Sequence, residues 1–160
     1  MKLAAIIQAR SNSNRLKDKM SLELSHNKKI FEWVLIRAIR SKKIKNFILA
    51  TTNNKRDKIL IKIAKKYNLK IFKGNEKDVL RRFYDCSKKL NLKTIVRVCA
   101  DNPLIDSKEI DRLVMNFVTC SLSDSFFESL WAFSKEAKLK ISAPKPSAFK
   151  FSLVCILLYK

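Results

Sequence analysis

The sequence predicts an α/β fold, a three-layer sandwich in which a mainly parallel sheet lies between layers of helices. Short, continuous apolar runs alternate along the chain with stretches whose apolar residues follow helical spacing. Continuous apolar runs are typical of strands that are covered on both faces, as strands of parallel sheets are. The chain has 160 residues and a hydrophobic content of 47%, which is enough to bury a core.

The elements follow one another in a regular order. Strands are expected at residues 3–7, 47–51, 69–72 and 94–99. Helices are expected over residues 30–39, 55–67 and about 76–90, and a last one begins near Ser107. In the first helix Phe31, Val34, Leu35 and Ala38 lie at helical spacing. Because strands alternate with helices, neighbouring strands should run parallel.

The composition changes at about residue 117. Residues 1–117 contain eleven Asn and all nine Arg of the chain, whereas residues 118–160 contain neither. We therefore expect one domain over residues 1–117 and a divergent tail over residues 118–160 that forms no assignable domain. The tail carries Pro144 and Pro146 and shows no clear alternation typical of a strand. The sheet is thus expected to keep an exposed edge.

The formal net charge of +21 suits an anionic ligand but identifies none. Lysine supplies 26 of the 35 cations, and the aromatic residues do not alternate with cations as a base-stacking surface requires. We therefore expect no nucleic-acid partner, although a basic nucleic-acid-binding module stays an alternative supported by the charge alone.

The sequence favours a cytoplasmic protein. No apolar run reaches the length of a membrane span, and Gln8 and Arg10 interrupt the first one too early for a signal peptide. We therefore expect no membrane association. The four cysteines contain no Cys-x-x-Cys pair, so reduced thiols are expected rather than a zinc site or a disulfide framework.

The loop after the first strand has the composition of an anion site. Residues 10–19 hold four cations, and only small polar residues lie between Arg10 and Arg15. Short side chains let backbone N–H groups surround an anion, while Arg and Lys neutralise it. A solvated basic loop would have the same charge count. The single glycine of the chain excludes both the dinucleotide-binding glycine motif and the Walker P-loop.

Four blocks of sequence carry a family resemblance. The first is Ile6-Ile7-Gln8-Ala9-Arg10 followed by Ser13, Arg15, Leu16 and Lys19. The others are Ala50-Thr51-Thr52, then Phe72-x-Gly74-x-Glu76-x-Asp78-Val79-Leu80-x-Arg82, and Val96-Arg97-x-x-x-Asp101-x-Pro103-Leu104-Ile105-Asp106. In this order they resemble the SpsF-like cytidylyltransferases, relatives of the CMP-sialate and CMP-Kdo synthetases. Lys17-Asp18 replaces the Pro-Gly of that family, and Asn12 replaces a Gly.

The resemblance implies a Rossmann-like sandwich of the nucleotide-diphospho-sugar transferase type and transfer of a cytidylyl group from CTP to a sugar for surface polysaccharide biosynthesis. Arg15 and Lys19 would be the catalytic cations. The CTP-binding residues would be Gln8, Ala9, Arg10, Ser13, Arg15, Lys19, Thr51 and Thr52. Mg²⁺ would be the cofactor, and Asp101 its ligand.

Acidic residues near the strand ends fall into two groups. Asp101 directly follows the fourth strand, where a carboxylate beside phosphates suits Mg²⁺, although Asp before x-Pro also shapes turns. Asp106 precedes a helix with Glu109 three residues on, so helix capping explains it better than catalysis. Asn75 and Asp78 are likewise expected to be a cap.

The resemblance covers residues 3–117, whereas family members are longer. Their second half supplies the sugar pocket, contacts of the homodimer and usually another metal-binding carboxylate. We therefore expect the C-terminal half of the fold to be missing here. The alternative to an active enzyme is a truncated fragment that binds nucleotide without catalysis.

Overall fold

The computed structural model describes residues 3–12, 18–120 and 152–154. The elements are β1 (Leu3–Gln8), the 3₁₀ turn η1 (Lys19–Ser21), β2 (Glu23–Ser25), β3 (Lys28–Lys29), α1 (Ile30–Ala38), β4 (Phe47–Thr52), the 3₁₀ turn η2 (Lys55–Asp57), α2 (Lys58–Lys66), β5 (Lys70–Gly74), α3 (Val79–Lys89), β6 (Thr94–Cys99), α4 (Ser107–Cys120) and β7 (Ser152–Val154).

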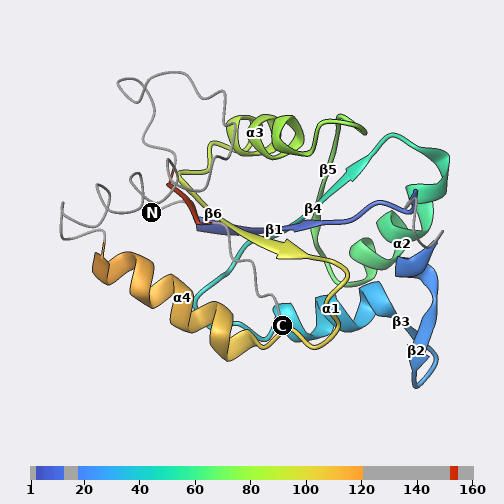
Figure 1. Ribbon diagram of the computed structural model, residues 1–160, viewed down its shortest axis with the longest axis horizontal. Coiled ribbons are helices and arrows are strands. Elements are labelled where there is room, and N and C mark those ends of the chain that lie inside the picture. Colours follow the sequence, from blue (N-terminus) through green and yellow to red (C-terminus); the bar gives the residue numbers. More distant parts are fainter. Residues whose placement is uncertain (1–2, 13–17, 121–151, 155–160) are drawn as a thin grey trace, which may run out of the picture.

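The main sheet has the strand order β5-β4-β1-β6-β7, and every neighbouring pair in it is parallel. Helix α3 covers one face, while α1, α2 and α4 cover the other (Figure 1). The predicted α/β sandwich with a mainly parallel sheet is confirmed. Its central strand is β1, which is paired on both sides.

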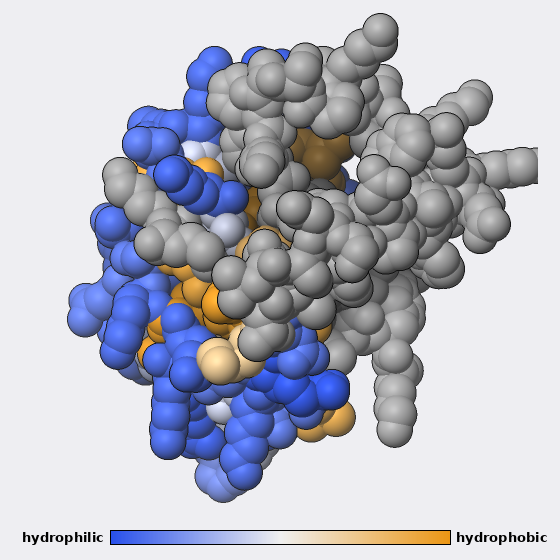
Figure 2. Space-filling model, turned by 90° about the vertical axis from the view of Figure 1, so that its left-hand side faces the viewer, coloured by the Kyte–Doolittle hydropathy of each residue, from blue (hydrophilic) through white to orange (hydrophobic). Residues whose placement is uncertain are grey.

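Alternation along β1 divides the core into two clusters. Ala5 and Ile7 pack with residues of α1, α2 and α4, whereas Ala4 and Ile6 pack with Phe83 of α3. All four of these β1 side chains are fully buried. A strand covered on both faces needs apolar residues at every position, which explains the continuous apolar run. Figure 2 shows hydrophilic residues around the hydrophobic ones on one face of the molecule.

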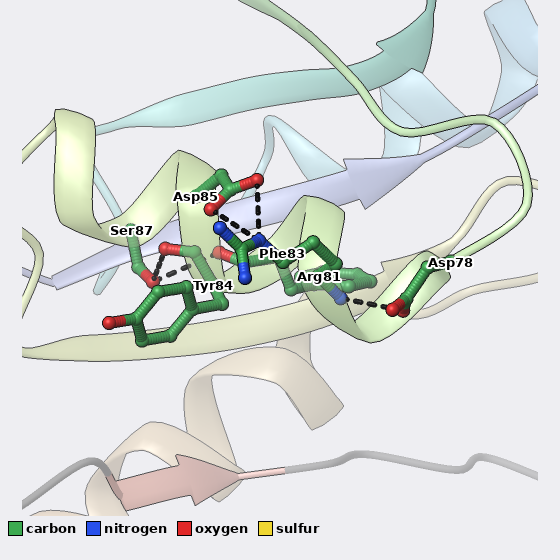
Figure 3. Close-up of polar contacts among 6 residues, drawn as sticks. All are labelled: Asp78, Arg81, Phe83, Tyr84, Asp85 and Ser87. Carbon is green, nitrogen blue, oxygen red and sulfur yellow. Dashed lines mark hydrogen bonds and ion pairs between the residues drawn. The ribbon is translucent and has the colours of Figure 1, made fainter.

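Helix α3 begins later than expected because a cap defines its start. The side chain of Asp78 accepts a hydrogen bond from the Arg81 N–H at 2.8 Å (Figure 3). Asn75 accepts bonds from the backbone N–H groups of Lys77 and Asp78. Residues 76–78 therefore form the approach to the helix. The expected capping role of Asp78 is confirmed, whereas Asn75 stabilises the turn before the cap.

The second predicted helix also begins later than expected. Asn54 accepts a hydrogen bond from the Arg56 N–H, so the 3₁₀ turn η2 precedes α2. The expected capping role of Asp106 before α4 is confirmed, because its carboxylate accepts a bond from the Lys108 N–H at 2.9 Å. Helix α4 continues to Cys120, past the expected boundary at residue 117.

Two features of the sheet structure differ from the expectations. β2 and β3 form an antiparallel hairpin whose turn residues, His26 and Asn27, have φ values of 51° and 54°. The prediction that the tail adds no strand is wrong, because β7 pairs in parallel with β6.

Among the helices over the described residues, none combines the length and apolar character that a bilayer crossing requires.

Candidate nucleotide site

The candidate site lies where three neighbouring strands end. Gln8 in β1 is in register with Ala50 in β4 and with Cys99 in β6. The pairing continues past the strand, because the Ala9 N–H donates to Ala50 and the Ala100 N–H donates to the Gln8 carbonyl, both at 3.3 Å. Ligands of open α/β sheets bind beyond these carboxyl ends. The sheet therefore brings three of the four sequence blocks to one edge.

Lys19, from the first of the four sequence blocks, and Asp101, from the last, lie close together at this edge. The Lys19 Nζ lies 3.8 Å from a carboxylate oxygen of Asp101, and the two side chains are 36% and 55% exposed. An exposed pair at this distance contributes little to stability. Both charges consequently remain accessible to a ligand, with a cation and a carboxylate side by side.

Arg10 and Asn12 contact the segment that follows β5. The Arg10 Nη1 donates to the Glu76 carbonyl at 3.2 Å. The Glu76 carboxylate accepts from the amides of Asn12 at 3.5 Å and Asn54 at 3.3 Å. Glu76 thus joins the segments after β1, β4 and β5, a role that the sequence blocks did not reveal.

Thr51 and Thr52 point inward, toward Asp57. Their hydroxyls donate to the same oxygen of Asp57 at 2.8 and 2.5 Å, and both residues are buried. Burial alone would raise the pKa of Asp57, but hydrogen bonds from Thr52, Ser11 and Thr51 hold it below its ordinary value. Both hydroxyls are committed to Asp57 here, so a direct contact of Thr51 or Thr52 with the nucleotide stays a prediction.

Asp18 occupies a backbone conformation that suits glycine. Its φ is 53° and its ψ is 21°, in the left-handed region. Side chains other than that of glycine cost about 1–2 kcal/mol there, least for Asp and Asn. This conformation explains why the family pattern has Gly where this chain has Asp18. The Asp18 N–H donates to the Ser11 carbonyl at 3.2 Å, which joins the two ends of the loop.

Arg82 is a buried cation whose charge interacts with that of Arg10. It is fully buried, and its Nη1 donates to the Asn75 carbonyl. Burial lowers the pKa of Arg82, and the positive charge of Arg10 lowers it further. Arg82 fits because residue 74 is glycine, since a Cβ on Gly74 would lie 2.9 Å from the Arg82 Cγ and 2.8 Å from a ring carbon of Phe72.

The remaining predicted residues are placed as follows. Ala9 is buried, and the Oε1 of Gln8 is buried and has no hydrogen-bond partner among the residues that the structure describes. Ser13 and Arg15 lie outside the described residues. The structure therefore brings Gln8, Arg10, Lys19 and Asp101 to one edge of the sheet and leaves the positions of Ser13 and Arg15 open.

Asp101 fits a magnesium site only together with ligand oxygens. Over residues 3–12, 18–120 and 152–154 there is no group of three or more His, Cys, Asp or Glu side chains that could hold a metal ion. Mg²⁺ is usually held by one or two carboxylates together with phosphate oxygens and water. A single exposed carboxylate beside the predicted phosphate-binding loop would meet that requirement.

Comparison with known proteins agrees with this geometry. The sequence model of the cytidylyltransferase family matches residues 4–120. The chain is 43% identical over 114 residues to the protein MJ1063 of Methanocaldococcus jannaschii. The aligned region covers 71% of this chain and 46% of that protein. The chain is 31% identical over 114 residues to the spore coat polysaccharide biosynthesis protein SpsF of Bacillus subtilis, which covers 68% and 47%.

Solved structures show the same fold. A cytidylyltransferase from Leptospira borgpetersenii serovar Hardjo-bovis matches with a TM-score of 0.71 and 37% identity, over 74% of this chain and 50% of that one. CMP:2-keto-3-deoxy-manno-octonic acid synthetase complexed with CTP matches with a TM-score of 0.63 and 18% identity, over 74% and 48%. The chain spans about half the length of these relatives. With the family match over residues 4–120, the chain belongs to the cytidylyltransferase family.

Proposed function

We propose that this domain binds CTP with Mg²⁺ and serves cytidylyl transfer to a sugar. The observation that carries the proposal is the approach of Lys19 to Asp101, at 3.8 Å, beyond the carboxyl ends of β1 and β6. Phosphates at this edge would lie against Arg10 and Lys19, and against Arg15 if it takes the role that the family pattern implies. Arg82 adds a buried positive charge that interacts with that of Arg10.

In the proposed reaction a sugar hydroxyl attacks the α-phosphorus of CTP. The new bond joins the sugar oxygen to phosphorus, the bond from phosphorus to the bridging oxygen breaks, and pyrophosphate leaves with that oxygen. The hydroxyl proton passes to the solvent. Such a transfer depends on positioning and on neutralising charge, which are the tasks of Arg10, Arg15 and Lys19. Bound Mg²⁺ would add positive charge at the phosphate oxygens, held on the protein side by Asp101.

We also propose surface polysaccharide biosynthesis as the pathway and a sugar as the acceptor. The name of the relative SpsF, a spore coat polysaccharide biosynthesis protein, supports both. A homodimer is proposed on the same ground of family membership.

Nucleotide choice tests the proposal directly. We expect the chain to bind CTP with Mg²⁺ more tightly than GTP in titration calorimetry. Arg15→Ala should weaken CTP binding by about 1.5–3 kcal/mol, because it removes a charge-assisted hydrogen bond. Arg40→Ala is the matched control, since exposed Arg40 follows α1 at the opposite edge of the sheet. Equal binding of CTP and GTP, or equal losses in both variants, would contradict the proposal.

The metal role of Asp101 is tested separately. We expect Asp101→Asn to abolish the Mg²⁺ dependence of CTP binding while the fold stays intact, because Asp101 is exposed and its contact with Lys19 is long, at 3.8 Å. Asp85→Asn is the control, since Asp85 pairs with Arg81 on the outer surface of α3 (Figure 3). Thermal unfolding monitors the fold. An unfolded Asp101→Asn protein would show that Asp101 shapes the turn before Pro103 instead.

A further inference from the structure

Asp57 is a buried carboxylate that joins two loops of the candidate site. It ends η2, just after β4, and is 1% exposed. One carboxylate oxygen accepts the Ser11 N–H at 2.7 Å. The other accepts the Thr52 N–H at 3.1 Å together with the hydroxyls of Thr51 and Thr52. Asp57 therefore connects the segment after β1 to the end of β4, across 46 residues of sequence.

The donors around Asp57 require a carboxylate. A hydroxyl can rotate and accept a bond, but a backbone N–H can only donate. Because Ser11 and Thr52 each direct a backbone N–H at a different oxygen, both positions must be acceptors. The side-chain amide of an Asn at residue 57 would place an NH₂ group against one of these two N–H groups in either orientation.

Ser11 connects Asp57 to the loop through its own hydrogen bonds. It is 1% exposed, and its hydroxyl donates to the Arg56 carbonyl at 3.2 Å. Its own carbonyl accepts the Asp18 N–H, so the residues on both sides of 13–17 are held together at Ser11. Lys19 follows Asp18 directly and reaches Asp101. A continuous set of bonds thus runs from Asp57 through Ser11 and Asp18 to the cation at the site.

We propose that Asp57 is a positioning residue, which holds both ends of the phosphate-binding loop and thereby places Arg10 and Lys19 for the nucleotide. Asp57 itself contacts no substrate in this role. This inference rests on the proposed function, because it takes CTP as the nucleotide that this chain binds.

The test is Asp57→Asn with a matched control, Asp111→Asn. Asp111 in α4 also receives a backbone N–H on each oxygen, from Lys42 and Lys43 at 2.9 and 3.0 Å, and a hydroxyl from Ser41 at 2.5 Å. It joins α4 to the turn after α1. Each variant therefore disturbs a carboxylate that accepts one backbone N–H on each oxygen, in one case at the loop and in the other case elsewhere.

We expect Asp57→Asn to raise the Kd for CTP with Mg²⁺ by about tenfold or more, and Asp111→Asn to change it by less than about threefold. The amides of Ser11 and Asp18 should exchange hydrogen faster in Asp57→Asn only. Unchanged CTP binding in a folded Asp57→Asn protein, or equal losses in both variants, would overturn the proposal.

Two further measurements keep the outcomes distinguishable. If the unsubstituted chain binds no CTP, the proposed function fails, whereas the exchange rates at Ser11 and Asp18 still decide whether Asp57 holds the loop. If Asp57→Asn does not fold, the unsubstituted chain decides, because the proposal requires slow exchange at both amides without nucleotide. Fast exchange there would overturn it.

Discussion

Replacing Phe31 with Ala is expected to lower the free energy of unfolding by about 3–5 kcal/mol. Phe31 lies in α1, is fully buried, and belongs to the core cluster between the sheet and helices α1, α2 and α4. The substitution removes apolar surface from the core and leaves a cavity, because the surrounding strands and helices can move only partly into the space. Because small domains have about 5–15 kcal/mol of total stability, the loss would be a large fraction.

Urea unfolding at neutral pH measures this loss. Leu104→Ala is the control, because Leu104 is 77% exposed and its truncation should change the free energy of unfolding by about 0.5 kcal/mol or less. A loss below about 1 kcal/mol for Phe31→Ala would contradict the packing described here.

Acidification is expected to destabilise the chain through Asp57 and Asp111, two carboxylates that each accept several hydrogen bonds. The pKa of Asp57 is lowered below its ordinary value of 3.8, because its hydrogen bonds outweigh the opposing effect of burial. The pKa of Asp111 is lowered in the same way by its bonds from Ser41, Lys42 and Lys43. A lowered pKa means that the folded chain binds fewer protons than the unfolded chain. The stabilisation is therefore present above the ordinary pKa and is lost as the pH falls through the folded one.

The variants Asp57→Asn and Asp111→Asn make this measurable. Asp57→Asn should lower the free energy of unfolding by about 1–3 kcal/mol at pH 7, because one buried backbone N–H is left without an acceptor. Asp111→Asn should lower it less, because the N–H groups of Lys42 and Lys43 are exposed and can bond to water instead. Below about pH 4 the difference from the unsubstituted chain should shrink, because its own carboxylates become protonated there. Urea unfolding from pH 7 to about pH 2.5 follows the trend. A difference that stays constant over this range would show that the carboxylate charge does not contribute.

Local sequence determined most of the elements. The continuous apolar runs of β1, β4 and β6 predicted buried parallel strands within one residue of their bounds. Helical spacing located α1 equally well. These patterns are local, and both faces of this sheet are covered, so local hydrophobicity and tertiary burial agree. Start positions were less accurate at α3, where the Asp78 cap delays the helix to Val79.

The short hairpin of β2 and β3 had only a weak signal. Its turn uses His26 and Asn27 at positive φ, where a glycine would have been the usual indication. β7 was missed for a related reason, because three residues are too few to show alternation, and its pairing with β6 is a long-range contact.

The sequence by itself determined that the cations Arg10 and Lys19 follow the first strand and that Asp101 follows another. Only the tertiary structure decided that Lys19 reaches Asp101 and that Ser11 bonds to Asp57. The physical reason is the strand order, which places β4 and β6 on either side of β1 and so brings distant segments together at one edge. The sequence around Asp57 does not indicate this role, because Ser11, which donates to it, becomes its neighbour only in the folded sheet.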